Sequence, residues 1–371
     1  MKNNALRFGL RFIFSAFLVA FAAQINVTLA DGQFGDHIRQ IAPVFGVSIA
    51  IVLLGGYRYL LAAFIGALLS SAFVEQNFLL VISLPLSVTL SAAFAYYVLS
   101  ILRVDISMER IRDTMHIIIF GFIISPFFGA GLHTVFLCAG DDLIAWNQFA
   151  TILMANWLSA SMGAIIVTPF ILIWANPGGF RLAGHQAVEV GLWFAGIVVF
   201  GHMTFQNWAP TDTLFYPMEL AIFPIMAWAA IRFGLRGTSA GVLALAILAG
   251  WEIFQVLTGQ HLGMSQSPAN VWIFVGIVSI TSICLAAVMT EFKIREAQIL
   301  ENETRLRAFT EALPDIAFVL TAAVCFVMVF AGFPLVLGFV RLWAPQVVVD
   351  TIASMSFLSH YTSIIKGVID I

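Results

Sequence analysis

Residues 217–237 read PMELAIFPIMAWAAIRFGLRG. The stretch is apolar apart from Glu219 near its start and Arg232 and Arg236 near its end. A helix needs about 20 mostly apolar residues to cross a bilayer. A carboxylate inside such a helix is costly and usually marks a functional site. The stretch therefore predicts a membrane span with a polar site near one end and a basic boundary at the other.

The rest of the chain has the same character as this stretch. Of its 371 residues, 61% are hydrophobic and only 10% are charged. Soluble domains carry roughly 25% charged residues, so this composition excludes a soluble globular protein. Because helices satisfy their own backbone hydrogen bonds in lipid, the predicted fold class is all-α, a polytopic transmembrane helical bundle.

Ten apolar segments before residue 291 are long enough to be candidate spans, and a further apolar span is expected at about 318–340. The ten cover roughly 8–29, 40–56, 58–75, 78–102, 114–139, 149–175, 186–206, 214–233, 236–257 and 271–290. The second and third are separated only by Gly56-Tyr57-Arg58, so either could be short or re-entrant. The first could be a cleaved signal peptide, but its apolar run continues past Ala22, which favours a retained anchor.

The basic residues predict the orientation of these spans, because cytoplasmic loops accumulate Lys and Arg. With the N-terminus inside, Arg39 is the only one of these basic residues on the outer side, and the acidic pair Asp141-Asp142 also falls there. The inner side receives Lys2, Arg7, Arg11, Arg58, Arg103, Arg110, Arg112, Arg181, Arg232, Arg236, Lys293, Arg295, Arg305 and Arg307. This uneven distribution supports both the number of spans and a cytoplasmic N-terminus.

After the tenth span the sequence becomes charged and rich in helix-forming residues. Phe292, Ile299, Leu306 and Leu313 recur every seven residues. Such a stripe is typical of a two-helix coiled coil, so the 291–313 helix predicts a homodimer and a signalling role. The alternative is a solvated amphipathic helix that leaves the membrane.

Three passages resemble the bacterial membrane-associated sensor domain of the first MASE type, over about residues 10–300. APVFGVSIAIVLLGGYRY (42–59) is similar to its Pro-x-x-Gly second helix, and NWLSASMGAIIVTPFILIW (156–174) to its Trp-rich helix ending in a Thr-Pro turn. Residues 217–237 are similar to its Pro-x-x-x-Trp-x-x-x-Arg-Phe-Gly pattern. The family often has an acidic residue before the Gly of the Trp-rich helix, but here residues 159–163 read SASMG, so a role for that acid does not carry over.

This resemblance implies the sensory input half of a signal-transduction receptor in the bacterial inner (plasma) membrane. Family members precede histidine kinase, cyclase, phosphodiesterase or PAS modules, so a cytoplasmic signalling partner and an unknown small ligand are expected. The domains predicted are a membrane-embedded sensor (1–290), a signalling helix with a truncated PAS entry (291–320) and an extra hydrophobic tail (321–371).

The tail does not continue a PAS domain. Residues 305–320 (RLRAFTEALPDIAFVL) resemble a PAS entry, whereas 321–371 resemble the C-terminal part of an ABC-2 type permease subunit. We interpret this change as a fusion junction near residue 320, with an unusual native tail as the alternative. The competing functions are therefore a transport permease component or a non-functional fusion fragment. The spans show no recognisable internal repeats, which many transporters have.

Four residues are candidates for sensing or ligand contact: Glu219, Glu252, Asn156 and Trp157. Glu252 sits toward the outer end of its span and could face the same cavity as Glu219. Asn156 with Trp157 could line a polar cavity, or Asn156 could make a hydrogen bond between helices. Structural or topological roles are expected for Trp228, Arg232, Arg236 and Pro169.

The chain contains no motif for catalysis or cofactor binding. It has no nucleophile elbow, phosphate-binding glycine loop, HExxH sequence or Cys/His metal spacing. We therefore expect no enzymatic activity, no cofactor, no metal and no nucleic-acid partner. The lipid bilayer is the one partner that the composition itself requires.

Overall fold

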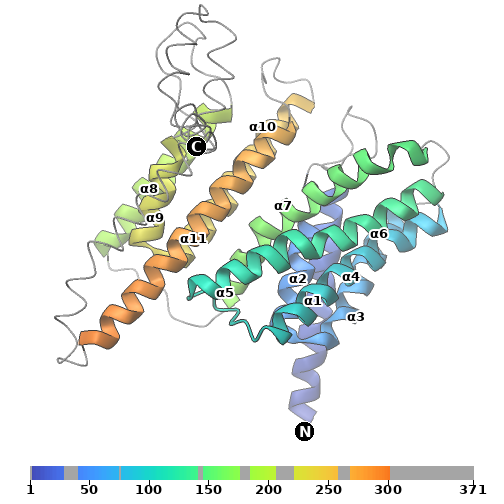
Figure 1. The fold of residues 1–371 in the computed structure, drawn as a ribbon, viewed down its shortest axis with the longest axis horizontal. Helices are drawn as coiled ribbons and strands as arrows, with labels where there is room; N and C mark the ends of the chain where they lie inside the picture. Colours follow the sequence, from blue (N-terminus) through green and yellow to red (C-terminus); the bar gives the residue numbers. More distant parts are fainter. Residues whose placement is uncertain are drawn as a thin grey trace, which may run out of the picture. The chain divides into compact units, whose positions relative to one another are not determined.

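The computed structural model describes residues 2–28, 41–74, 77–140, 145–175, 184–205, 221–257 and 268–300. Within these ranges every regular element is a helix (Figure 1), which confirms the all-α polytopic bundle. The membrane helices belong to a compact unit, Met1–Ile294. The final residues of the last helix enter a second unit, Arg295–Ile371.

The described elements include eleven α-helices, with shorter 3-10 and π-helical segments between some of them. In chain order they are α1 Lys2–Thr28, α2 Pro43–Gly55, η1 Tyr57–Tyr59, α3 Leu60–Val74, α4 Phe78–Ile101, α5 Ile111–His116, the π-helical segment η2 Ile117–Ile124, α6 Ser125–Gly140, η3 Trp146–Gln148, α7 Phe149–Ala175, α8 Gly184–Phe205, α9 Ile222–Arg232, α10 Gly234–Leu257 and α11 Pro268–Leu300.

Seven helical stretches are long and apolar enough to cross a membrane. They are Tyr57–Val74, Phe78–Ile101, Ile111–Gly140, Trp146–Ala175, Ala187–Phe205, Gly234–Gln255 and Asn270–Glu296. Three shorter apolar helices, Gly9–Ile25, Pro43–Gly55 and Ile222–Arg232, account for the remaining predicted spans. Each of the ten segments expected before residue 291 thus coincides with an apolar helix.

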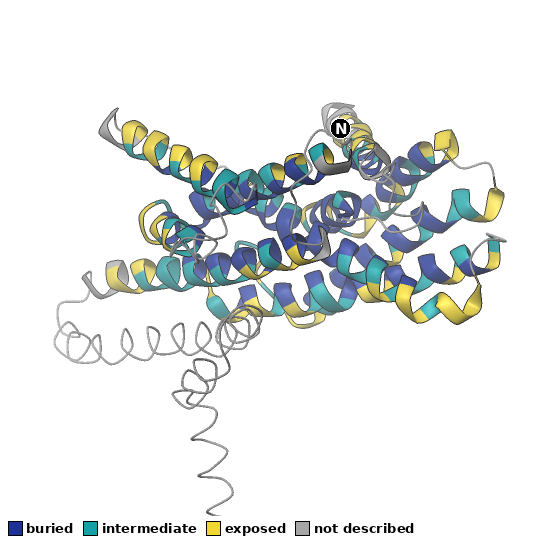
Figure 2. Ribbon diagram, turned by 90° about the horizontal axis from the view of Figure 1, so that it is seen from above, coloured by how far each residue is buried: buried dark blue, intermediate teal, exposed yellow. Residues whose placement is uncertain are grey.

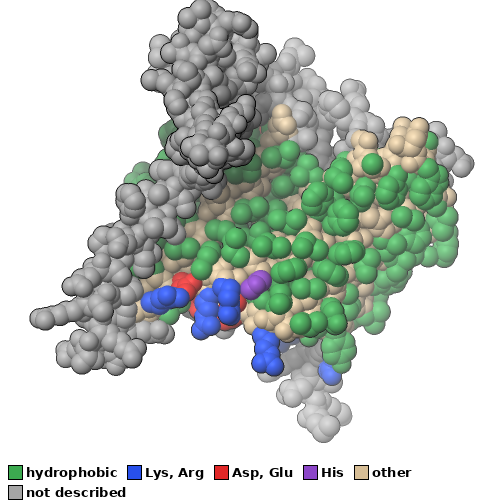
Figure 3. All heavy atoms as spheres, in the orientation of Figure 1, with side chains coloured by type: hydrophobic (Ala, Val, Ile, Leu, Met, Phe, Trp, Pro, Cys, Tyr) green, Lys and Arg blue, Asp and Glu red, His purple; other side chains and the backbone are tan. Residues whose placement is uncertain are grey.

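The outer surface of the helices is apolar. Phe73, Phe14 and Leu192 have relative exposures of 85%, 62% and 65%. Buried residues line the faces where helices meet (Figure 2), and hydrophobic side chains cover much of the face in Figure 3. Soluble monomers rarely expose apolar patches of this extent, and lipid is the solvent that such a surface fits.

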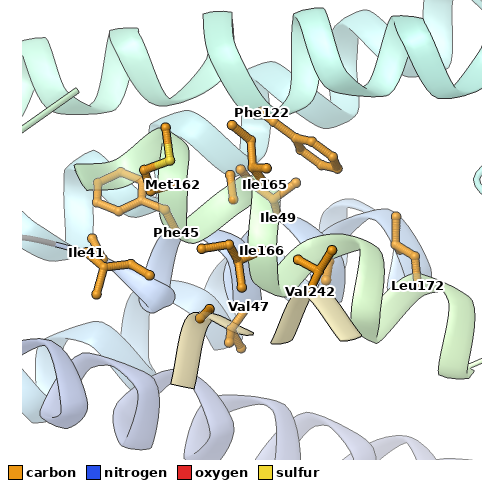
Figure 4. Packing of buried hydrophobic residues seen from close by; sticks show 14 of the residues in the cluster. Ile41, Phe45, Val47, Ile49, Phe122, Met162, Ile165, Ile166, Leu172 and Val242 are labelled. Atoms are coloured by element: carbon orange, nitrogen blue, oxygen red, sulfur yellow. The ribbon is translucent and has the colours of Figure 1, made fainter. Parts of the chain in front are cut away.

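The core of the first seven helices is the contact between α2 and α7. Every residue from Val44 to Val52 is buried, and α2 also packs against α1 and α4. Figure 4 shows Phe45, Val47 and Ile49 of α2 beside Ile165 and Ile166 of α7. Buried apolar side chains from both helices make up this region, as in the close-packed interiors of other proteins.

Two glycines bring α2 and α7 into backbone contact. A side chain on Gly163 would collide with the backbone of Ala42 and Pro43, and one on Gly46 would meet Val167 Cβ at 2.9 Å. Small residues allow this close approach between membrane helices. The Thr168 hydroxyl then donates a 2.9 Å hydrogen bond to the Gly46 carbonyl, which fixes the register of the pair.

α2 begins inside the bundle rather than at its rim. The helix has 13 residues and is therefore about 20 Å long, less than the roughly 30 Å of a bilayer core. Its buried start is satisfied locally, because the Ala42 N–H donates to the Ser159 carbonyl of α7 at 3.1 Å and Pro43 has no N–H. The second predicted span is thus the short one, whereas the third is long enough to cross.

α8, α9 and α10 pack on one another, and α10 also contacts α7. α9 turns into α10 at Phe233-Gly234, where Gly234 has φ +64°, a conformation that favours glycine. The Trp193 ring of α8 packs against Gly241 of α10, and its Nε1 donates to the Ile225 carbonyl of α9 at 3.1 Å. The Arg-Phe-Gly pattern therefore marks a tight turn between two antiparallel helices.

Pro169 corrects one expectation drawn from the sequence. The resemblance placed a Thr-Pro turn at the end of the Trp-rich helix, but Pro169 lies inside α7, which continues to Ala175. A proline in a membrane helix is tolerated when neighbouring groups satisfy the freed backbone. Thr168 and Pro169 are buried against α2 instead of forming a loop.

Candidate sensing and coupling sites

Glu219, the first candidate of the sequence, lies outside the described residues, as does Pro217. The described part of its stretch begins at Ala221 and continues into α9. Trp228 has a relative exposure of 46%, which suits a residue on the outer surface of the bundle. Glu219 and any cavity that it shares with Glu252 therefore remain sequence predictions.

Glu252 is a buried carboxylate with a partner in a neighbouring helix. Its Oε1 lies 2.9 Å from Nδ1 of His202, so the pair joins α10 to α8. Glu252 is 4% exposed, whereas the His202 side chain is 41% exposed. A histidine–carboxylate pair changes its charge when it takes up a proton, and its geometry changes when a ligand replaces one partner.

The sequence pointed to Glu252 but not to His202. A lone histidine in an apolar helix has no local pattern that identifies its partner 50 residues away. The available signal was that both residues lie in the last third of their spans, in α8 and α10, which run from the same side. A buried acid that needs a donor should have directed attention to such a residue.

Asn156 and Trp157 attach α7 to its neighbours. The Asn156 Nδ2 donates to the Thr134 hydroxyl of α6 at 3.2 Å, and both residues are buried. The Trp157 Nε1 donates to the Ile123 carbonyl at 2.8 Å. Ile123 belongs to η2, and π-helical turns free a carbonyl from the regular helix ladder. Asn156 thus contacts α6 and Trp157 contacts η2. These contacts between helices do not involve Glu252.

The helix ends that carry Arg and Lys lie at the same end of the bundle. Figure 3 shows the described basic side chains on this face gathered along one edge. Arg232, at the end of α9, donates to Glu189 near the start of α8 at 2.7 Å. We call the end of the bundle that holds Arg232 and Glu189 the basic end. Arg236 follows in the first turn of α10, so both predicted topology residues lie here.

The basic end also holds the point where α11 leaves the bundle. Glu291 Oε2 accepts a hydrogen bond from the Ile111 N–H, the first residue of α5, at 2.9 Å. Lys293 Nζ donates to the Ile231 carbonyl at the end of α9 at 2.7 Å. Sequence reasoning placed Lys293 on the inner side but predicted neither contact, since the partners are 180 and 62 positions away.

The predicted signalling stripe is described only in part. Phe292 is half-buried in α11, and Ile299 lies in the last turn of the same helix. Leu306 and Leu313 lie outside the described residues. The last predicted span and the described part of the signalling helix form one continuous helix, α11, from Pro268 to Leu300.

Among the described residues, no group of three or more His, Cys, Asp or Glu side chains could hold a metal ion. The sulfur pair of Cys284 and Met115, 3.7 Å apart, joins α11 to α5 within the apolar part of the bundle. Both sulfur atoms act there as packing groups.

Comparison with known proteins identifies the family to which this chain belongs. No curated protein and no solved structure matches the chain. The MASE1 family matches residues 12–293, which is most of the chain and covers the candidate spans of the described bundle except for the first residues of Gly9–Ile25 and the last residues of Asn270–Glu296. With that coverage, this membrane protein belongs to the MASE1 family, whose members are membrane-associated sensory input domains of signalling receptors.

Proposed function

We propose that the chain is the input module of a bacterial inner-membrane receptor, with its N-terminus in the cytoplasm and no catalytic activity of its own. The observation that carries the proposal is the continuity of α11. Its apolar stretch Asn270–Glu296 has the length of a membrane span, and the same helix extends to Leu300. A rigid helix that begins among the spans and ends outside them is suited to transmit a change of packing.

α11 is in contact with several parts of the bundle. Gly276 packs against the sulfur of Met162 in α7, and the Phe274 ring lies 6.5 Å from Phe205 of α8 and 6.1 Å from Phe223 of α9. A shift of any of these helices must therefore be accommodated by α11. Packed interfaces tend to switch between discrete arrangements, which supports a two-state output.

The His202–Glu252 pair is the described site best suited to receive a stimulus. It lies at the end of α8 and α10 that is opposite the basic end, and a small ligand or a proton would act there on two helices at once. A stimulus that binds one packing of these helices better than another shifts the population toward it. Glu219 stays a second candidate for the same role.

The output of the module is proposed to pass through a dimer. The stripe of Phe292, Ile299, Leu306 and Leu313 would pair two copies of the 291–313 helix and present them to a cytoplasmic signalling partner. The permease alternative rests on residues 321–371, which lie outside the described ranges. The fusion junction near residue 320 likewise stays a sequence prediction.

A reporter fusion tests helical transmission. A diguanylate cyclase is fused after Leu300, and one to four alanines are inserted between Glu296 and Ala297. Each inserted residue rotates the reporter by about 100°, so cyclase output should vary with the insert and recover near four residues, about one turn. Alanines placed in a flexible linker beyond Leu300 serve as the control. A flat output across the series would remove α11 as the transmitting element.

A further inference from the structure

The start of α5 is capped by a residue from another helix. The residue before it, Arg110, gives no side-chain cap, and the Ile111 N–H donates instead to the Glu291 carboxylate of α11. The N-terminus of a helix carries a partial positive charge, so a carboxylate stabilises it. Glu291 therefore supplies the hydrogen-bond acceptor that Arg110 does not, and it adds a second carboxylate to Asp113 in the first turn.

The end of α9 is capped in the opposite sense. The Lys293 ammonium donates to the carbonyl of Ile231, one residue before the end of the helix. The C-terminus of a helix carries a partial negative charge, which a cation stabilises. The neighbouring Arg232 directs its own side chain to Glu189 of α8, so the cation at the Ile231 carbonyl comes from α11.

These two caps hold α11 from different sides. Residues two positions apart on a helix point in nearly opposite directions, because each residue turns by about 100°. Glu291 thus reaches α5 while Lys293 reaches α9. A rotation of α11 in either direction lengthens at least one of the two hydrogen bonds, and an exchange of the two contacts would place each charge at the wrong helix end.

We propose that Glu291 and Lys293 form a clamp, two positioning residues that fix the rotation of α11 where it leaves the bundle, and that signalling requires at least one side of the clamp to open. The second part rests on the proposed function. The first part concerns only the position of a helix, and it can be measured without any output.

The test is a distance measurement by electron paramagnetic resonance on the full chain in lipid nanodiscs. Spin labels replace the exposed residues Glu109 and Ile294, after Cys138, Cys284 and Cys325 are changed to alanine. The unmodified clamp should give one narrow distance distribution. Glu291→Ala and Lys293→Ala should each broaden it or add a second distance.

A charge exchange makes the test specific. Glu291→Lys combined with Lys293→Glu keeps the net charge but places a cation at a helix N-terminus and an anion at a helix C-terminus. The distribution should broaden at least as much as in either alanine variant. Lys293→Arg, which keeps a cationic donor, should restore the narrow distribution. Glu296→Ala changes an exposed carboxylate on the same helix and should leave the distribution unchanged.

Two results would overturn the clamp. One is an unchanged distribution in the charge-exchange variant, and the other is equal broadening by Glu296→Ala. If the exchange variant loses its helical circular dichroism, Glu291→Gln decides, because it removes the charge and keeps an acceptor oxygen. It should give intermediate broadening, and an unchanged distribution would contradict the proposal. The clamp and the proposed function can fail separately. If the distances respond as expected but cyclase output stays flat across the alanine insertions, the clamp is retained and the proposed function is rejected.

Discussion

At the scale of single residues, the His202–Glu252 pair stands out because it puts a carboxylate in an apolar bundle. Burying a charge without a partner is costly, so the contact with His202 contributes to holding α8 against α10. In the proposed function the same pair also receives the stimulus, so stability and response would depend on the same two side chains.

Removing His202 should destabilise the bundle. We expect His202→Ala to lower the free energy of unfolding by about 1–3 kcal/mol, because the buried Glu252 carboxylate loses this donor. Thermal unfolding in detergent, followed by circular dichroism, measures the change.

A double-mutant cycle provides the control. The combined variant His202→Ala with Glu252→Ala should cost less than the sum of the two single changes, with a coupling of about 0.5–3 kcal/mol. Strict additivity would mean that the contact does not join the two helices.

At the scale of elements, α2 is a helix too short to span a bilayer, and backbone contacts hold it against α7. At its start, the Ala42 N–H donates a hydrogen bond to the Ser159 carbonyl of α7. The body of the helix lies against Gly163 and Val167 of α7. Hydropathy alone identifies such a segment as apolar but gives no information on where it begins in depth. Its length of 13 residues and its buried surface together place it inside the bundle.

Gly163→Ala tests this contact. The added Cβ would collide with the backbone of Ala42, which cannot move aside as a side chain could, so we expect a loss of about 1–3 kcal/mol in unfolding free energy. Gly191→Ala is the matched control, since nothing lies within 4 Å of its Cβ position. That variant should be neutral or slightly stabilising because alanine favours helix. Equal effects of both changes would refute the close contact.

At the scale of the whole molecule, the basic end gives the bundle a direction. Arg103 and Arg110 border the connection between α4 and α5, and Arg232, Arg236 and Lys293 lie at the neighbouring helix ends. Cytoplasmic loops collect such residues, so the basic end is expected in the cytoplasm.

Side-specific labelling tests this orientation. A single cysteine at Glu109, in the connection that leads to α5, should react with a membrane-impermeant maleimide only after the cells are opened. A single cysteine at Trp146, before α7, should react in intact cells. The reverse pattern would invert the proposed topology, and equal reaction of both would contradict the single crossing, Ile111–Gly140, that is expected between them.

The sequence was sufficient for the helices and their class, because span length and apolar character are local properties. The hydrogen bond between helices that was one of the two readings of Asn156 is present, to Thr134 of α6, whereas a sensing role for Glu252 stays a prediction. The sequence did not place Pro169 inside α7, since the tolerance of a proline depends on neighbours that the sequence does not show. It missed His202 as well, because an acid and its donor in two different helices share no spacing rule.

The clamp residues were missed for a related reason. Glu291 and Lys293 read as ordinary charges of a helix that emerges from the membrane, and their roles depend on two helix ends distant in the sequence. Leu306 and Leu313 stay predictions, since the described part of the chain ends at Leu300.

The contact between Gly46 and Gly163 also limits how this protein can vary. In most of a membrane domain, replacing glycine with leucine or valine raises hydropathy and is accepted by the bilayer. At these two positions the same changes would separate α2 from α7, because the partner there is backbone. Selection at these sites therefore acts on side-chain volume rather than polarity, and a variant that looks better adapted to lipid would be the one that fails to assemble.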